Sequence, residues 1–333
     1  NDDFTTSALV DNSTSLSSTA TSVNADSTTD VDTYVIGTAA SVGAAGATIG
    51  VNNINSTTTA EVNNSTIGKA GTITPDVSVD AHNKVTTNFG AATSSAGAAA
   101  IGVGVGINTV DTGTLAKVTN STVNAKTAAV TSREELDVDQ TMAGATLGGF
   151  GLNTNVMVTT IGTQVADSYG SDADKSGKVD TKSILANANN AIGSQNNNLT
   201  SGSNLISSDA GVTVSNNSGV SAKTGVTTPA AGTQTLVDNS TITTSDALTI
   251  SADRQTDATL TAAAATVAGV SGANVTVATL DAKKDAGVTI SGKSVLSSAK
   301  DLTVQAKQHG TTAVKAYQAA LSGGLSVNAA FAQ

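Results

Sequence analysis

Aspartates that follow short apolar segments are the residues of this chain whose spacing could do chemistry. Asp26, Asp80, Asp139 and Asp253 each come directly after such a segment, as in Leu248–Ala252. If the segments stack as parallel strands, we expect the four carboxylates in one column with a spacing of about 4.8 Å. Like charges at that spacing must be solvated or bridged by cations. Such a face could also cleave a polysaccharide if it held a further acid, base, Arg or Lys.

The two histidines give little support to a catalytic reading. His82 lies two residues from Asp80, which suggests a pair at the end of a strand, and His309 lies in the segment 307–310, which reads as an exposed turn. Lys307 falls near the aspartate column but stands alone. The sequence has no Gly-rich phosphate loop, nucleophile elbow or paired-His motif. We therefore predict that the chain is not an enzyme.

The alternative is a β-helix enzyme that acts on polysaccharides, such as a lyase or a tailspike-like hydrolase. Sugar-binding faces usually carry aromatic platforms, and only 2% of the residues are aromatic. A third alternative is binding to an ice or crystal surface through columns of threonine. The threonines that recur in register are Thr14, Thr66, Thr122 and Thr241.

One segment has a candidate metal site, formed by Asp172, Asp174, Ser176 and Asp180. These residues resemble the start of an EF-hand calcium loop, which has oxygen ligands at positions one, three, five and nine and glycine at six. Here Ser183 stands at position twelve, where that loop has a bidentate acid. Calcium is the one cofactor that this pattern suggests. The alternative is an acidic turn that leads into a helix packed on the side of the fold.

The helix expected after this loop has Ile184, Leu185, Ala188 and Ile192 on one face, and Gly193 is placed to end it. Loop and helix belong to a segment at about 166–231 that interrupts the repeat pattern described next. The predicted organisation is therefore repeats at 1–165, an insertion at 166–231 and repeats again at 232–333.

The strongest pattern is a repeat of a hydrophobic residue, any residue, and Asn-Ser-Thr. Asn12, Asn64, Asn120 and Asn239 mark its copies, at steps of 52, 56 and 119 residues. A degenerate copy at 288–292 puts Ser291 at the marker position. A second copy of the chain after Gln333 would continue the spacing, which suggests one period of a longer tandem array. Self-similarity at this period is typical of stacked repeat architectures, so we expect the asparagines in one column.

Strands are predicted wherever β-branched residues alternate with small ones. In Ile101–Ile107 every apolar residue falls on one face, and Gly102, Gly104 and Gly106 fall on the other. Glycine inside a strand usually marks the close approach of another backbone. We expect the glycine side to be buried against a second sheet, closer than the usual spacing of about 10 Å. The Val/Ile side should meet other apolar residues.

Composition fits long strands better than a globular core. The chain has 333 residues and no cysteine, and it has only two prolines, which suits long uninterrupted strands. Its net charge of −10 argues against nucleic acid as a partner. The uncharged stretches 89–110 and 142–165 are long enough to cross a bilayer, but their periodicity is that of strands, so no membrane span is expected. The predicted fold is all-β: an elongated parallel β-solenoid of about five units of roughly 54 residues, with one inserted, partly helical segment.

The units resemble those of giant repetitive surface adhesins of Gram-negative bacteria, the filamentous-haemagglutinin and leukotoxin-type filamentous adhesins. The residues that carry the resemblance are Val237–Ile242, then Ala247–Asp253, then an Ala/Gly run to Val275–Val277. The resemblance covers nearly the whole chain except the insertion. It implies a secreted, extracellular fibre at the bacterial cell surface that contacts further copies of itself and a host cell or matrix. It implies no catalytic residue.

Overall fold

The computed structural model describes residues 2–15, 20–68, 75–162, 232–282 and 285–333, and every regular element in these ranges is a β-strand. The large sheet contains β1 (Asp2–Asp11), β3 (Thr21–Ala40), β4 (Gly43–Asn63), β6 (Val77–Thr119), β8 (Ala128–Ile161), β9 (Gly232–Asp238), β11 (Leu248–Ala282), β12 (Asp285–Ser291), β14 (Leu302–His309), β15 (Thr312–Ser322) and β16 (Leu325–Ala332). A small sheet contains β2 (Thr14–Ser15), β5 (Thr66–Ile67), β7 (Thr122–Ala125), β10 (Thr241–Thr244) and β13 (Val295–Ser298).

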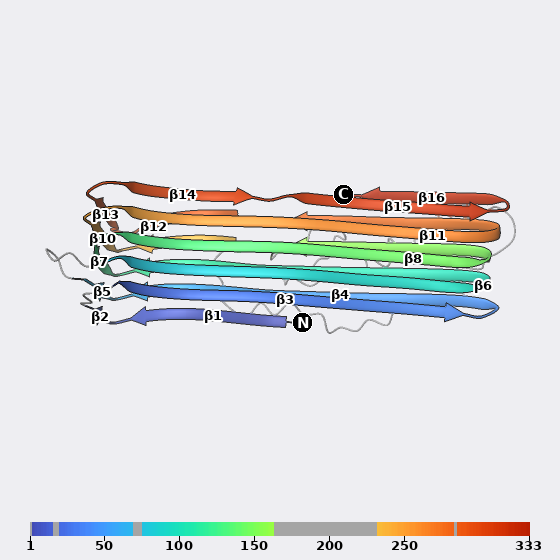
Figure 1. Cartoon of the computed structure of the whole chain (residues 1–333), viewed down its shortest axis with the longest axis horizontal. Coiled ribbons are helices and arrows are strands. Elements are labelled where there is room, and N and C mark those ends of the chain that lie inside the picture. Colours follow the sequence, from blue (N-terminus) through green and yellow to red (C-terminus); the bar gives the residue numbers. More distant parts are fainter. Residues whose placement is uncertain (1, 16–19, 69–74, 163–231, 283–284) are drawn as a thin grey trace.

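The chain runs out along one layer and back along another, and each pass stacks on the previous one (Figure 1). β6 shows this arrangement, because its first half pairs with β3 and its second half pairs with β4. We call 21–40, 77–97, 128–148, 248–268 and β14–β15 the outgoing layer. The returning layer contains β1, β4, 99–119, 150–161 with β9, 271–282 with β12, and β16.

All strand pairings in both sheets are parallel. The all-β prediction is therefore confirmed, and the long parallel sheets are consistent with a β-solenoid. The returning part of β8 pairs with β6 as far as Ile161, which lies opposite Val110. Pairing with β6 resumes in β9, where Gly232 lies opposite Gly113. The predicted insertion and its helix lie outside the described residues.

Alternation in sequence determines which side chains enter the space between the layers. Near the Asn-Ser-Thr end, one residue in two is Val, Ile, Leu or Ala and is fully buried, as with Val79, Val130 and Ile250. Further along, the interior becomes polar. Asn52 donates a hydrogen bond to the Thr87 hydroxyl at 3.2 Å, and Ser56 donates one to Asn83 at 3.0 Å. These bonds join the returning layer to the outgoing layer.

The glycine face of 101–107 lies where the sequence places it. Gly102, Gly104 and Gly106 point into the interior and are buried. On the opposite side, Val105 and Ile107 pack with Val156 and Val158 and are 5% exposed or less. Both parts of that prediction are confirmed, while the spacing of the two layers at this point stays a prediction.

The predicted asparagine column is also confirmed. Asn12, Asn64, Asn120 and Asn239 all have positive φ, between 45° and 49°, and each donates its backbone N–H to a residue of the next strand. The marker of the fifth copy was wrong by one residue. Ser291 pairs with Asp238, so Gly292, with φ of 64°, takes the asparagine position. Asparagine and glycine are the residues that best tolerate this left-handed geometry.

Candidate functional site

The predicted aspartate column does not form. Asp26 and Asp253 do share a column on the outer face of the outgoing layer, but His82, Arg133 and Lys307 are its other members. Asp80 instead lies in the column of Asn24 and Thr131, and Asp139 in that of Asn88 and Thr259. The register is set by the buried apolar columns, and the aspartates follow these at different distances.

The column that does form mixes acidic and basic side chains, in the order Asp26, His82, Arg133, Asp253 and Lys307. His82 Nδ1 lies 3.2 Å from Asp26 Oδ1, and its Nε2 lies 3.7 Å from Glu135 Oε1. Arg133 Nη2 lies 2.5 Å from the same Glu135 oxygen. His82 therefore pairs with Asp26 and Glu135, and its predicted pairing with Asp80 is wrong. Asp26 and Asp253 are separated in this column by His82 and Arg133, so they do not form an uninterrupted row of acids.

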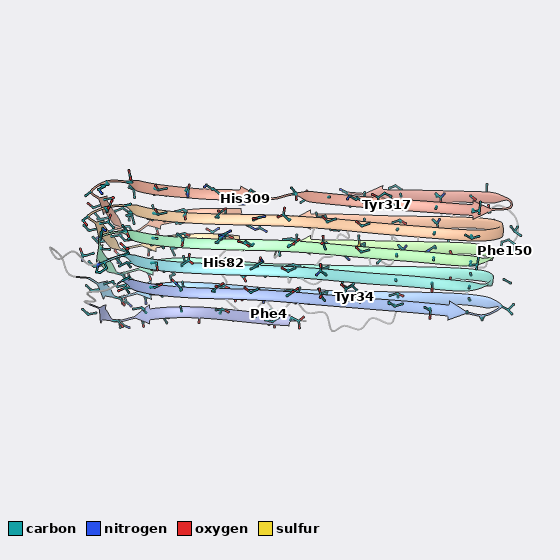
Figure 2. All side chains as sticks on the ribbon, viewed as in Figure 1. Phe4, Tyr34, His82, Phe150, His309 and Tyr317 are labelled. Atoms are coloured by element: carbon teal, nitrogen blue, oxygen red, sulfur yellow. The ribbon has the colours of Figure 1, made fainter. Side chains whose placement is uncertain are left out.

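His309 lies at the exposed end of β14, as the sequence suggested, with Gly310 at a φ of 145° after it. Its Nδ1 is 3.3 Å from Asp253 Oδ1. Figure 2 shows His82 and His309 on separate strands of the stack, at a similar position along its long axis. Lys307 lies beside Asp253, as expected for a cation near this column.

Two carboxylates of the next columns are electrostatically perturbed. Partial burial, together with the carboxylates of Asp139 and Asp257, raises the pKa of Asp137. Hydrogen bonds from Gln255 and Thr311 lower the pKa of Asp257. Asp257 accepts both the backbone N–H and the hydroxyl of Thr311, at 2.9 and 2.7 Å. This carboxylate therefore fastens the last outgoing strand to β11.

The four candidate calcium ligands, Asp172, Asp174, Ser176 and Asp180, lie outside the described residues. Within the described ranges, no group of three or more His, Asp or Glu side chains is arranged to hold a metal ion. The same ranges contain no helix with the length and hydropathy needed to cross a bilayer. The threonines at 14, 66, 122 and 241 do line up, but in the small sheet, whose strands are two to four residues long.

A buried ion pair was missed by the sequence reasoning. Arg254 Nε lies 3.4 Å from Glu134 Oε1, and these side chains are 2% and 0% exposed. Glu134 also accepts hydrogen bonds from the hydroxyls of Thr112 and, at 3.0 Å, Thr233. The signal was present in the alternation, because Arg254 continues the inward positions of Leu248, Ile250 and Ala252. Removing either charge would leave the other one buried without this ion pair, which is costly in a buried site.

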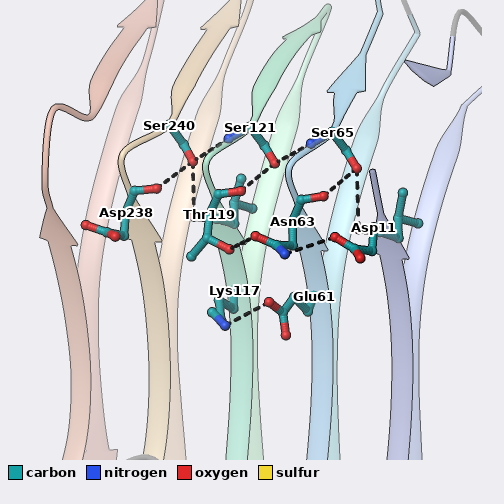
Figure 3. A network of polar contacts seen from close by, with 11 residues as sticks. Asp11, Glu61, Asn63, Ser65, Lys117, Thr119, Ser121, Asp238 and Ser240 are labelled. Carbon is teal, nitrogen blue, oxygen red and sulfur yellow. Dashed lines mark hydrogen bonds and ion pairs between the residues drawn. The ribbon is translucent and has the colours of Figure 1, made fainter. Parts of the chain in front are cut away.

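The Asn-Ser turns form a continuous polar column at one end of the stack (Figure 3). The backbone N–H of Ser65 donates to the hydroxyl of Ser121 at 3.1 Å, and that hydroxyl donates to the carbonyl of Thr119 at 2.6 Å. Ser121 and Ser240 repeat the arrangement at the same distance between strands. Each serine therefore satisfies backbone groups of its own turn and of the previous one, as expected for in-register polar ladders.

At each edge of the stack the returning layer ends in a short strand that covers only part of its neighbour, and the two short strands cover different parts. β1 covers the part of the returning layer next to the Asn-Ser turns, because Asp2 pairs with Ile54 and Asp11 with Asn63. β16 covers the distal part at the other edge, where Leu325 pairs with Ser271 and Ala332 with Ala278. The inner side of β14 consequently has no returning strand opposite it. Leu302 and Val304 are 50% and 46% exposed, whereas Leu248 and Ile250, their neighbours in β11, are 0% exposed.

A cavity of about 600 Å³ lies at this edge. It lies between Arg254 and Thr256 of the outgoing layer and Leu280 and Ala282 of the returning layer. Gln308 and Thr312 of the last outgoing strands line its other side. The backbone of Gln333 bonds to Ala278 and Leu280, so the cavity begins where the last returning strand ends.

Comparison with family models, with curated proteins and with solved structures gives no match. The arguments on function below therefore rest on the residues and geometry of this chain.

Proposed function

We propose that this chain is a structural and adhesive segment of an extracellular fibre, built as a β-solenoid of about five units of roughly 54 residues. Copies stack end to end, so that β1 of one copy completes the returning strand that β16 of another leaves half formed. The fibre is a stalk or adhesin at the bacterial cell surface and has no enzymatic activity.

The observation that carries the proposal is the exposed inner side of β14. Leu302 and Val304 lie in columns whose members in β11, β8 and β6 are core residues, yet about half of each side chain is accessible. Fully burying a Leu or Val side chain contributes roughly 1.5–3 kcal/mol, so covering both remaining halves would contribute about 2 kcal/mol. On β1, the inward residues Ala8 and Val10 already pack against the core at the other edge. The same face of β1 would cover Leu302 and Val304 in a stacked pair.

Charge at the two edges supports the same stacking. The outer face of β3 carries Asp26, Asp30 and Asp32, whereas β14 and β15 carry Lys307 and Lys315 at outward positions. In a stacked pair β3 of one copy would lie beside β14 of another, which places Asp26 next to Lys307. Each junction between copies would then set a basic side chain beside an acidic one. Unpaired strand edges are templates for this kind of association.

Sedimentation velocity and electron microscopy of the 333-residue chain test the stacking. We expect concentration-dependent, end-to-end assembly into narrow fibres. The double variant Leu302→Lys/Val304→Lys should remain monomeric, because the charges prevent the β14 face from being covered. The matched control is Leu321→Lys, since Leu321 is 69% exposed on the outer face of β15, away from the inner side of β14 that β1 would cover. A wild-type chain that stays monomeric at high concentration, with both edges covered by its own loops, would reject the proposal.

Adhesion is tested separately with assembled fibres. We expect them to bind cultured host cells or immobilised matrix proteins, and the monomeric Leu302→Lys/Val304→Lys variant to bind far less, because repeated weak contacts gain avidity only in an array. Fibres that assemble but bind no such surface would support a stalk role and remove the adhesive one.

A further inference from the structure

Two columns on the outer face of the outgoing layer have large side chains at both edges of the stack and small ones between. Tyr34 and Ile36 lie on β3 at one edge, and Lys315 and Tyr317 lie on β15 at the other. Strand pairing places Tyr34 and Lys315 at the two ends of one column, and Ile36 and Tyr317 at the two ends of the next. The residues between them are Gly90, Thr141 and Thr261 in the first column and Ala92, Ala143 and Ala263 in the second.

These two edges are exposed and mostly apolar. Ile36 is 76% exposed, Tyr34 70% and Tyr317 56%. Sheets usually protect their edges with charged residues, and the other half of β3 does so with its aspartates at 26–32. An exposed apolar edge strand is instead a template for another strand. The chain has three tyrosines, and two of them stand at these edges, which points to a role in association.

Within one copy each edge tyrosine has a small neighbour. A Cβ atom at Gly90 would lie 2.5 Å from Tyr34 Cδ1, so the tyrosine ring lies across this glycine. Tyr317 lies beside Ala263, whose methyl group is too short to cover the ring. Figure 2 shows the two tyrosines on strands at opposite sides of the stack, at a similar position along its long axis. Each ring therefore has one side that its own copy leaves open.

In a stacked pair the two edges are complementary. If β3 of one copy continues the columns of β15 of another, Tyr34 lies beside Lys315 and Ile36 beside Tyr317. A lysine ammonium within about 6 Å of a tyrosine ring is in a favourable cation–π geometry. An aromatic residue beside a β-branched one is a favourable pair on neighbouring strands. Two β3 edges would oppose acid with acid, and two β15 edges lysine with lysine, so association of like edges is disfavoured.

We propose that Lys315 and Tyr317 form a clasp that binds Tyr34 and Ile36 of a second copy of this chain. The inference rests on the end-to-end stacking proposed above and names the side chains by which one copy recognises the next. The clasp sets the register of the junction and its polarity, with β15 always meeting β3. Tyrosine side chains that are buried in an interface supply much of its affinity, so the clasp also drives assembly.

Photo-oxidative cross-linking of tyrosines tests the clasp in assembled fibres. Every chain in the experiment has Tyr169→Phe, so that Tyr34 and Tyr317 are its two tyrosines. Within one copy these two are four strand spacings apart, or about 19 Å. In the clasp they are diagonal neighbours on adjacent strands, at about 7–8 Å. Oxidation should yield a ladder of dityrosine-linked multimers, and Tyr34→Phe or Tyr317→Phe should each abolish it.

Side-chain truncation measures the contribution of the clasp to assembly. Tyr317→Ala and Ile36→Ala should each raise the concentration at which the chain assembles about tenfold or more. Leu147→Ala is the matched control, because Leu147 is 58% exposed on the same outer face but lies in β8, inside the sheet. It should leave assembly unchanged. Equal effects of all three substitutions would overturn the clasp, because the outer face as a whole would then drive assembly.

The outcomes separate the clasp from the proposed function. Fibres that form without a dityrosine ladder, or that form equally well from truncated and wild-type chains, would overturn the clasp and leave the stacking intact. A ladder that persists in Tyr34→Phe would mean that like edges meet, which would overturn the polarity. A wild-type chain that neither assembles nor cross-links would reject both proposals.

Discussion

Replacing Gly104 by valine tests the two-layer packing at the glycine face of 101–107. A Cβ atom at Gly104 would lie 2.6 Å from Asn155 Oδ1, 3.3 Å from Thr93 Oγ1 and 3.4 Å from Met142 Sδ. The first of these distances is well inside van der Waals contact, and valine adds two further methyl groups. Overpacking of this kind lowers stability by about 1–3 kcal/mol. That loss exceeds the roughly 0.4–1 kcal/mol of stability gained when a glycine is replaced and the unfolded chain becomes less flexible.

Gly102 is the internal control, because it lies on the same face two residues earlier. Its Cβ would meet nothing closer than 3.4 Å, to Thr146 Cγ2. Gly102→Ala should therefore be neutral or stabilising by up to about 1 kcal/mol. Thermal unfolding followed by circular dichroism compares the two variants with the wild type. We expect the melting temperature to fall for Gly104→Val and to hold or rise for Gly102→Ala. A melting temperature that is unchanged or raised in Gly104→Val would mean that this face is open to solvent.

Three further predictions concern the turns, the buried pair and pH. Asn120→Gly should be tolerated, as Gly292 is at the equivalent turn, whereas Asn120→Ala should cost about 1–2 kcal/mol in chemical denaturation because alanine disfavours positive φ. Glu134→Gln should cost about 3–5 kcal/mol in chemical denaturation, because it removes the charge that Glu134 sets against the buried Arg254. A loss under about 1 kcal/mol, as for an exposed ion pair, would contradict the burial. The pKa of Asp137 is raised, so its charged form is disfavoured in the fold, and its penalty is present at neutral pH and relieved as pH falls through the folded pKa. Asp137→Asn should therefore raise the melting temperature at pH 7, with the gain vanishing below the unfolded pKa of about 3.9, and a gain that persists at lower pH would contradict this cause.

Strand type and stacking were predictable because local chemistry determines both. The alternation of Gly and Val in 101–107 identifies a strand with two different faces, and left-handed geometry restricts the turn residue to Asn or Gly. That same rule could have moved the fifth marker from Ser291 to Gly292. The members of the Asp26 column were predicted wrongly, because the four aspartates were aligned by their position at the end of an apolar segment. Parallel register is instead set by the buried neighbours, such as Val23 opposite Val79.

Residue pairs that depend on the register between distant strands could not be predicted from local sequence patterns. Glu134 receives its hydrogen bonds from Thr112 and from Thr233, which is 99 residues away and follows the predicted insertion. Its inward direction was readable from alternation, but the identity of its partners was not. The complementary half-strands likewise became visible only when β1 and β16 were placed on their neighbours.

Disulfide cross-linking tests the stacking of copies most directly, because the chain has no cysteine. In the proposed pair, Asp26 of one copy lies beside Lys307 of another, on adjacent strands about 4.8 Å apart, which is within reach of a disulfide. The double variant Asp26→Cys/Lys307→Cys should oxidise to a ladder of covalent multimers on a non-reducing gel. Asp26→Cys/Leu321→Cys, with its second cysteine far along the outgoing layer, should give no ladder. Monomers from the first variant, or equal ladders from both, would contradict end-to-end stacking in this register.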